Sequence, residues 1–212
     1  MNDARTAFLD SATRATGFLA RPEVARSWAD PSVLADFSVS GLAGHLLRGI
    51  KTVETYLDGP EPVGEGLTAA GYYHAVGLTP DVAAPLNREV RARGEEAAVE
   101  GYEAVVLEAQ GVTQRLVERV PIESGERKIR VFGDRVMTLD EYLRTRVVEL
   151  VLHTDDLALS VGLPHEGTLP SPAASVAIDT LVDLARLRHG DVAVLWALAR
   201  RERDMVDALR VL

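Results

Sequence analysis

The sequence contains no cysteine, and this absence excludes several kinds of site. Without cysteine there is no disulfide framework, no thiolate nucleophile and no cysteine-based zinc site. Long apolar runs are also missing, since no stretch approaches the roughly 18 consecutive apolar residues of a membrane helix. The first residues lack the basic and then apolar layout of a signal peptide. We therefore expect a soluble, cytoplasmic protein with no membrane partner.

Positive charge is in short supply. The chain has 23 Lys and Arg against 32 Asp and Glu, a formal net charge of −9. Nucleic-acid-binding domains usually carry a basic face, so we expect no nucleic-acid partner. Three sequence motifs are missing as well: the Gly-x-Ser-x-Gly nucleophile elbow, Gly-x-Gly-x-x-Gly and the P-loop. Acyl-transfer hydrolases, dinucleotide-binding enzymes and NTPases therefore lack support.

What the sequence does contain is a strong helical pattern. Its 212 residues, 47% of them hydrophobic, suffice for one domain with a real core. Apolar residues recur at helical spacing over most of the chain, which predicts a mainly α fold. Helices are expected at about residues 3–19, 41–57 (with Ser40 as N-cap), 82–120, 138–162, 173–187 and 191–203. The remaining segments are expected to be a connection (22–37), a long loop (59–80) and a small hairpin (127–137).

The helix predicted over residues 138–162 has both ends marked. Thr138 is a good N-cap, Glu141 completes a capping box, and Gly162 ends the helix. Its apolar arc is wider than the roughly 100° stripe that a surface helix needs. A narrow polar seam occupies the rest, made of Tyr142, Arg146, Glu149, His153, Asp156 and Ser160. This pattern predicts a mostly buried helix with one polar stripe.

Glu149 and His153 stand four residues apart on that seam, so both side chains project to the same side. This is the geometry of two ligands of one metal ion, although a solvated polar stripe is the commoner interpretation of such a pair. Because branched apolar residues surround the pair, a buried Glu or His there needs a partner.

The third ligand is offered by His45, on the helix predicted at 41–57. Gly41, Gly44 and Gly49 remove bulk beside it, and a glycine inside a helix costs about 1 kcal/mol relative to alanine. Three of them suggest that another backbone or a ligand comes close. A single histidine in such a helix is more often hydrogen-bonded in the core or at the surface.

Two imidazoles and one carboxylate supply three nitrogen and oxygen donors and leave a fourth position open. That number of ligands is typical of catalytic zinc sites, so we expect a divalent metal, most plausibly Zn²⁺. A thiol or water bound at the open position would ionise near neutral pH. Spacing alone does not establish that the two helices are neighbours.

Two segments resemble the mycothiol-dependent maleylpyruvate isomerase N-terminal family, which belongs to the DinB-like metalloprotein superfamily. They are residues 37–46 (FSVSGLAGHL, with Trp28 ahead of them) and residues 146–158 (RVVELVLHTDDLA). The resemblance covers roughly residues 5–163. It implies a four-helix bundle of up-up-down-down-like arrangement and a divalent metal, usually zinc, at His45, Glu149 and His153. It also implies a low-molecular-weight thiol such as mycothiol as co-substrate.

The chain departs from the family pattern after residue 163. The resemblance implies that the isomerase of this family has two domains. Its α/β C-terminal domain is expected to help close the active site and to supply an arginine. Here residues 164–212 are predicted to be helical. We expect residues 1–163 to form the metal-binding bundle and 164–212 an extension packed on it, or on the second subunit of a homodimer. In the extension, Arg186, Arg188 or Arg200 could replace the missing arginine.

The favoured function is that of a metal-dependent thiol S-transferase or isomerase, with a small-molecule thiol and an electrophile as substrates. Four further residues are candidates for contacting the co-substrate or the ligands: Tyr73, His74, Arg146 and Asp156. Asp156 would fix an imidazole or be solvated, and Arg146 would pair with Glu149 or receive a substrate carboxylate. Tyr73 and His74 would face the substrate or pack down. The alternatives are a non-catalytic metal-binding or interaction module and a metal-dependent hydrolase on the same ligands.

Overall fold

The computed structural model describes residues 3–77, 81, 83–163, 171–202 and 206–212. Most of these residues lie in helices, and one small antiparallel sheet of two strands accompanies them. The predicted mainly α fold with a small hairpin is therefore confirmed. Within the described ranges no helix is both long enough and apolar enough to cross a lipid bilayer.

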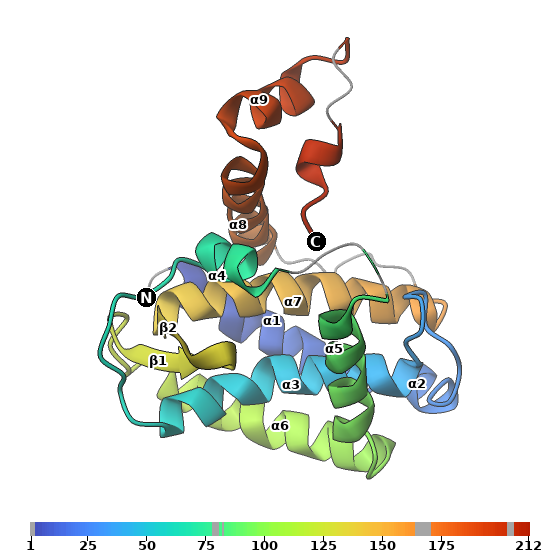
Figure 1. Ribbon diagram of the computed structural model, residues 1–212. Helices are drawn as coiled ribbons and strands as arrows, with labels where there is room; N and C mark the ends of the chain where they lie inside the picture. The colour runs from blue at the N-terminus through green and yellow to red at the C-terminus, as the bar shows by residue number, and fades with distance from the viewer. Residues whose placement is uncertain (1–2, 78–80, 82, 164–170, 203–205) are drawn as a thin grey trace.

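Four helices form the bundle: α1 (Asp3–Leu19), α3 (Val39–Asp58), α6 (Tyr102–Arg119) and α7 (Leu139–Ser160). Around the bundle α1 contacts α7, α7 contacts α3, α3 contacts α6, and α6 closes the circle on α1. In Figure 1, α1 and α7 run in one direction and α3 and α6 in the other. Each helix contributes fully buried apolar side chains to one common core, among them Phe8, Leu46, Leu116 and Val147.

The helix α3 begins earlier than the sequence suggested. Its N-cap is Ser38, whose hydroxyl accepts a hydrogen bond from the Gly41 N–H at 2.8 Å. The prediction of Ser40 as the cap was wrong, because Ser40 already lies in the first turn with its hydroxyl 2.8 Å from that of Ser38. Both serines suit an N-cap, and only the backbone conformation at Ser38 is extended, as a cap requires.

Two segments expected to be irregular contain short helices. The connection over 22–37 begins with α2 (Pro22–Arg26), and the loop over 59–80 contains α4 (Ala69–Val76). Thr138 is the N-cap of α7, as predicted, and its hydroxyl accepts a hydrogen bond from the Glu141 N–H. The Glu141 carboxylate does not complete the capping box, since it accepts a hydrogen bond from Ala69 N–H at 2.7 Å. This acidic side chain therefore ties α4 to the start of α7.

The stretch over 82–120, predicted to be helical, contains two helices, α5 (Pro85–Ala97) and α6, separated at Gly101 with a φ of +94°. Figure 1 shows α5 lying across α3. A β-carbon on Gly44 would overlap the carbonyl oxygen of Gly94, and one on Gly94 would lie 2.5 Å from the carbonyl oxygen of Gly41. Gly41 and Gly44 therefore lie against the backbone of α5, and close approach of another backbone was one of the two reasons predicted for these glycines. Gly49 instead faces the Leu150 side chain of α7.

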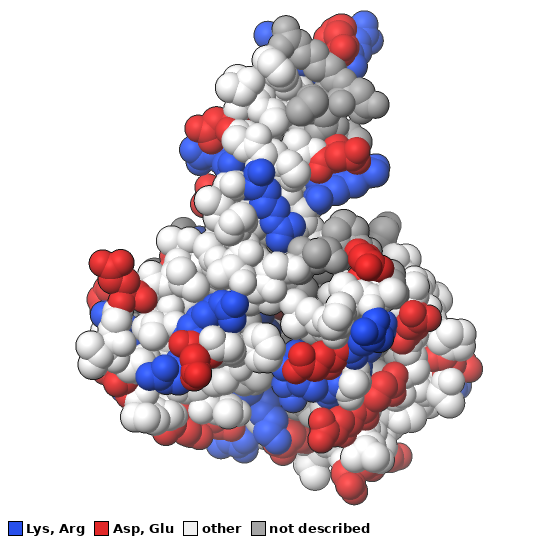
Figure 2. Space-filling model, viewed as in Figure 1, with Lys and Arg blue, Asp and Glu red and all other residues white. Residues whose placement is uncertain are grey.

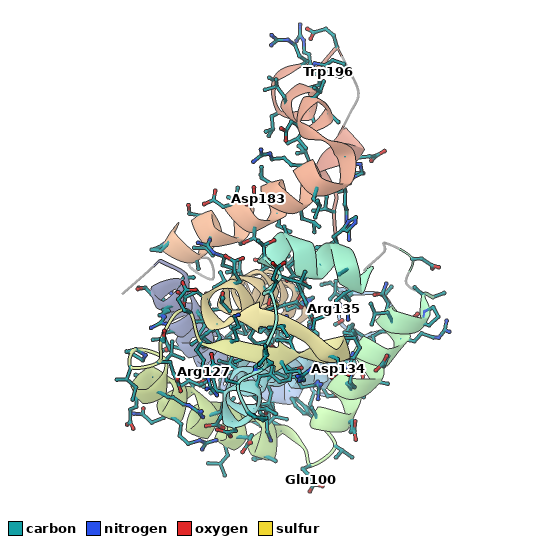
Figure 3. The ribbon with its side chains drawn as sticks, turned by 60° about the vertical axis from the view of Figure 1, so that its left-hand side comes forward. Glu100, Arg127, Asp134, Arg135, Asp183 and Trp196 are labelled. Carbon is teal, nitrogen blue, oxygen red and sulfur yellow. The ribbon has the colours of Figure 1, made fainter. Side chains whose placement is uncertain are left out.

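The predicted hairpin is present as β1 (Lys128–Val131) and β2 (Arg135–Thr138), paired antiparallel. Its turn contains Gly133 with a φ of +71°. On its far edge the Leu67 N–H donates to the Val136 carbonyl at 2.8 Å, which joins the segment before α4 to β2. Arg135 reaches from the hairpin to α4 and donates to the Ala75 carbonyl at 2.8 Å (Figure 3).

The chain continues into α8 (Ser171–His189), α9 (Asp191–Ala199) and a 3₁₀ turn, Val206–Leu209. We call residues 171–202 and 206–212 the C-terminal arm. The helix α8 contacts α1, α4 and α7, whereas α9 packs on α8 and the 3₁₀ turn. In Figure 1 the arm projects from the bundle. Figure 2 shows acidic and basic side chains interspersed over the bundle and the arm on this face.

Candidate metal centre

Three side chains converge where α3 packs on α7. His45 comes from α3, and Glu149 and His153 come from α7. One ligand atom of each lies within 4.8 Å of the other two. The Glu149 Oε2 atom is 3.1 Å from His45 Nε2 and 3.4 Å from His153 Nε2. The two imidazole rings are 4.7 Å apart and nearly perpendicular. The helices that carry the predicted ligands are therefore neighbours.

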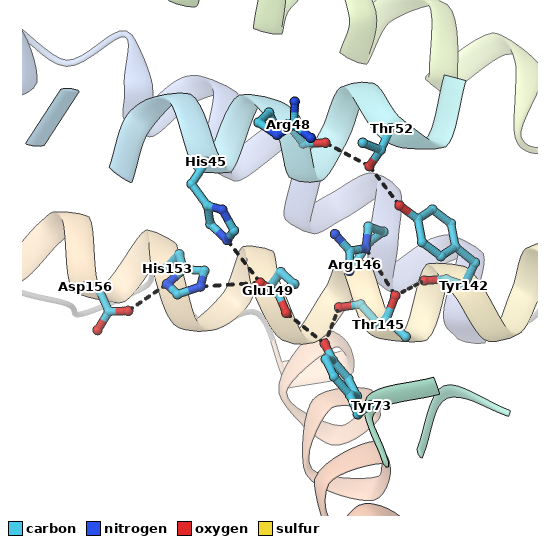
Figure 4. A network of polar contacts seen from close by, with 10 residues as sticks. All are labelled: His45, Arg48, Thr52, Tyr73, Tyr142, Thr145, Arg146, Glu149, His153 and Asp156. Atoms are coloured by element: carbon cyan, nitrogen blue, oxygen red, sulfur yellow. Dashed lines mark hydrogen bonds and ion pairs between the residues drawn. The ribbon is translucent and has the colours of Figure 1, made fainter. Parts of the chain in front are cut away.

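Two further side chains hold this cluster in place (Figure 4). Asp156 Oδ2 lies 3.0 Å from His153 Nδ1, which leaves His153 Nε2 facing Glu149. Of the two interpretations of Asp156, the structure shows contact with the imidazole. The Tyr73 hydroxyl lies 3.0 Å from Glu149 Oε1 and 3.0 Å from the Thr145 carbonyl oxygen. Tyr73, which lies on α4, thus contacts the predicted metal ligand Glu149 on α7.

The cluster is electrostatically coupled. Burial acts to raise the pKa of Glu149, but hydrogen bonds to His153 and His45 and the nearby Arg146 charge outweigh it and hold that pKa well below its ordinary value. Burial lowers the pKa of His45. For His153 burial acts in the same direction, yet the Asp156 and Glu149 carboxylates raise its pKa to about 9. The carboxylate is therefore ionised at neutral pH.

Arg146 does not form an ion pair with Glu149, which was one of its two predicted roles. Its Nε donates to Thr145 Oγ1 at 3.1 Å, and its guanidinium lies 4.9 Å from the centre of the Tyr142 ring. Within the described residues no carboxylate lies at ion-pair distance from it. The Tyr142 hydroxyl in turn donates to Thr52 Oγ1 at 2.8 Å, which orients the ring beneath the guanidinium.

The cluster forms part of the wall of a cavity of about 480 Å³. Apolar and aromatic side chains from several elements make up much of the lining: Leu34, Phe37, Val76, Leu86, Val90, Phe132 and Leu152. Four arginines also face it: Arg48, Arg91, Arg93 and Arg146. A ligand in this cavity would meet the three candidate metal ligands, an apolar surface and positive charge.

The remaining predicted residues lie elsewhere. His74 is exposed and is not part of the cavity lining, unlike its neighbour Tyr73. None of the three arginines proposed from the C-terminal arm lines the cavity either; Arg186, for example, pairs with Asp183 and Asp191. From the described part of the arm, Leu212 lines the cavity.

Sequence reasoning missed Arg48, Arg91 and Arg93. Arg48 follows His45 by three residues and therefore shares its helix face, a signal that was available. Arg93 gave no such signal, because its position depends on how α5 crosses α3. Its guanidinium stacks 4.8 Å from the ring centre of Phe132, at the hairpin turn.

Comparison with known proteins identifies the family of this chain. The family model described as the mycothiol maleylpyruvate isomerase N-terminal domain matches residues 8–158. The chain belongs to this family. The match includes α3 and α6 and most of α1 and α7, and it contains His45, Glu149 and His153. No curated protein sequence matches the chain.

Two solved structures share the fold. The chain is similar to a crystal structure of the mycothiol-dependent maleylpyruvate isomerase, with 15% sequence identity and a TM-score of 0.53. It is also similar to a histidine-to-alanine mutant of that isomerase, with 15% identity and a TM-score of 0.54. Each comparison covers 86% of this chain and 68% of the other. At this identity the similarity concerns the fold.

Proposed function

We propose that this member of the isomerase N-terminal domain family is a metal-dependent enzyme that activates a low-molecular-weight thiol. In this proposal His45, Glu149 and His153 hold one divalent cation, with Zn²⁺ the first candidate. The thiol, mycothiol or a relative, is the co-substrate of an isomerisation or an S-transfer. The observation that carries the proposal is the convergence of three ligand atoms within 4.8 Å of one another in the wall of a cavity.

The donor set fits a divalent cation. An ionised carboxylate and two imidazoles match the ligands and the number of protein ligands of catalytic zinc sites. Glu149 Oε2 already lies near both imidazole nitrogens, and Asp156 fixes the His153 ring with Nε2 toward the cluster. A carboxylate behind a ligating histidine is a common feature of metal sites.

A divalent cation bound here would stabilise the thiolate form of a coordinated thiol at neutral pH. The protein's own groups supply the surroundings for the reaction. Apolar side chains such as Phe37 and Phe132 line the cavity and offer an apolar surface to a bound substrate. The Arg146 guanidinium faces the same cavity without an ion pair to any described residue and can receive an anionic substrate group.

The substrates are then a thiol and an electrophile that accepts its sulfur. Addition to a cis double bond, rotation and elimination would return the thiol and isomerise the substrate. Displacement of a leaving group would instead form a thioether. The cavity of about 480 Å³ beside the cluster supports an enzyme over a purely structural metal-binding module.

The test begins with metal and thiol binding by the purified full-length chain. We expect about one equivalent of divalent metal by elemental analysis. After Co²⁺ substitution, addition of mycothiol should produce a sulfur-to-cobalt charge-transfer band, and glutathione and cysteine serve as competing thiols. Turnover is then followed by mass spectrometry with electrophiles that carry a cis double bond or a leaving group.

Two histidine variants provide the comparison. His153→Ala removes a proposed ligand and should abolish both metal retention and the thiol-dependent band. His74→Ala removes an exposed histidine outside the cavity and should change neither. A wild-type chain that binds no divalent metal, or binds it equally well without His153, would refute the proposal.

A further inference from the structure

We propose that Tyr73 is a positioning residue that makes Glu149 bind the cation through one oxygen, which keeps a coordination position free for the exogenous thiol. This inference rests on the proposed metal site and goes beyond it. It assigns a role to Tyr73, whose hydroxyl contacts one predicted ligand, Glu149. That role concerns how many oxygens of the Glu149 carboxylate are available to the metal.

The two carboxylate oxygens of Glu149 have different partners. Oε2 faces the imidazoles of His45 and His153, at 3.1 and 3.4 Å. Oε1 points to the other side and lies 3.0 Å from the Tyr73 hydroxyl (Figure 4). One oxygen is therefore directed at the candidate cation position, and the other is engaged by a group outside the cluster.

The Tyr73 hydroxyl has one proton and two acceptors in reach, Glu149 Oε1 and the Thr145 carbonyl oxygen. Hydrogen bonds to an ionised carboxylate are stronger than bonds to a neutral carbonyl. We therefore infer that the Tyr73 O–H donates its hydrogen bond to Glu149 Oε1.

The hydroxyl is held in place independently of any metal. The Tyr73 side chain is 1% exposed. The helix α4 that carries it is anchored at its start by the Glu141 carboxylate on Ala69 N–H and at its end by Arg135 on the Ala75 carbonyl. Because both ends of the helix are fixed, the hydroxyl cannot follow the carboxylate if Glu149 turns.

Losing this hydrogen bond has a definite consequence. A carboxylate can bind a cation through one or both oxygens, and among the described residues it is Tyr73 that hydrogen-bonds to Oε1. Without it, Oε1 is free to approach the cation and take the position that the thiol requires. In the empty site, a buried carboxylate oxygen would also lose its hydrogen-bond donor, which costs free energy.

The experiment compares Tyr73→Phe with Tyr102→Phe in the full-length chain. Tyr102 begins α6 and does not line the cavity, and its hydroxyl donates to the Arg21 carbonyl at 3.3 Å, so the control also removes a tyrosine hydroxyl that makes a hydrogen bond. Zn²⁺ affinity is measured by chelator competition, coordination by the visible spectrum of the Co²⁺ form, and thiol affinity by titration of that form. We expect Tyr73→Phe to weaken Zn²⁺ binding by about 10–100-fold, the usual effect of removing a group that orients a ligand. It should also change the Co²⁺ spectrum and weaken thiol binding, while Tyr102→Phe matches the wild type.

A second measurement needs no variant. Infrared difference spectra of the wild-type chain with and without Zn²⁺ distinguish a carboxylate bound through one oxygen from one bound through two, by the separation of its two stretching bands. Binding through one oxygen is expected, and binding through both would overturn the inference even if Tyr73→Phe failed to fold. If Tyr73→Phe and Tyr102→Phe bind metal and thiol alike, the inference is wrong and the metal site stands. A wild-type chain that binds no metal would overturn both.

Discussion

Asp156 illustrates at the residue scale how a side chain outside the ligand set orients one within it. Its carboxylate lies 3.0 Å from His153 Nδ1, so the other ring nitrogen is left for the cluster. We predict that Asp156→Asn lowers Zn²⁺ affinity by about 10–100-fold, because the ring loses a charged acceptor and becomes a weaker ligand. Chelator competition at constant pH measures the change.

Asp183→Asn is the control for this prediction, since it makes the same chemical change in the C-terminal arm, where Asp183 is exposed and pairs with Arg186. It should leave Zn²⁺ affinity unchanged. Equal affinities for the wild type and Asp156→Asn would mean that the contact with His153 has no influence on the site.

At the scale of elements, the crossing of α3 and α5 depends on the absence of side chains. A β-carbon on Gly44 would overlap the Gly94 carbonyl oxygen, a backbone atom that cannot rotate away. We predict that Gly44→Ala destabilises the fold by about 1–3 kcal/mol, as overpacking usually does. Urea unfolding followed by circular dichroism provides the measurement.

Gly17→Ala is the matched control, because Gly17 also lies in a helix but a β-carbon there meets nothing within 4 Å. Alanine at that position should stabilise the protein, by up to about 1 kcal/mol. Loss of stability in both variants would point to a general intolerance of alanine rather than to the helix crossing.

The α3 and α6 helices are joined by an ion pair that predicts a pH dependence. Arg115 donates to both carboxylate oxygens of Glu54, at 2.7 and 2.9 Å, and this bonding lowers the pKa of Glu54 despite the opposing effect of burial. A carboxyl whose pKa is lower in the folded chain stabilises the fold above its unfolded pKa and loses that contribution as the pH falls.

We therefore predict that Glu54→Gln costs up to about 1 kcal/mol of unfolding free energy at pH 7, within the range for exposed pairs. At pH 3 the difference should shrink, because the wild-type carboxyl becomes protonated. Urea unfolding at both pH values tests this. A difference of the same size at pH 3 would show that packing of the side chain, not its charge, is responsible.

At the scale of the whole molecule, the proposed metal links distant parts of the chain. His45 and Glu149 are separated by 104 positions, and no such site exists in the unfolded chain. Metal binding should therefore stabilise the fold by mass action. We predict that EDTA lowers the melting temperature of the metal-loaded protein and that His153→Ala no longer responds to EDTA. Identical melting curves with and without EDTA for the wild type would contradict a bound metal.

The C-terminal arm supplies a second prediction at this scale. We propose that residues 164–212 complete the bundle domain rather than fold alone. The helix α8 buries Val176 and Leu184 and contacts α1, α4 and α7. Truncation after Gly162 should therefore expose apolar surface on the bundle, lower the melting temperature and promote self-association. Scanning calorimetry and light scattering, with the full chain as reference, measure both effects. A truncated protein as stable and as monomeric as the full chain would refute this view.

The sequence by itself determined the features that depend on neighbours a few positions apart. Helical periodicity predicted the bundle helices, a turn containing Gly133 predicted the hairpin, and the four-residue spacing of Glu149 and His153 placed them on one face. His45 was chosen for its glycine surroundings and from the family resemblance.

Only the tertiary structure decided which of these local features meet. The Tyr73 hydroxyl reaches Glu149 across 76 positions, and Glu141 bonds to Ala69 instead of closing its own capping box. Arg93 faces the cavity because α5 crosses α3 backbone against backbone. These contacts depend on the packing of whole helices, and a side chain with two possible partners takes the one that packing brings within hydrogen-bond distance. Local sequence pattern carries no information on that choice.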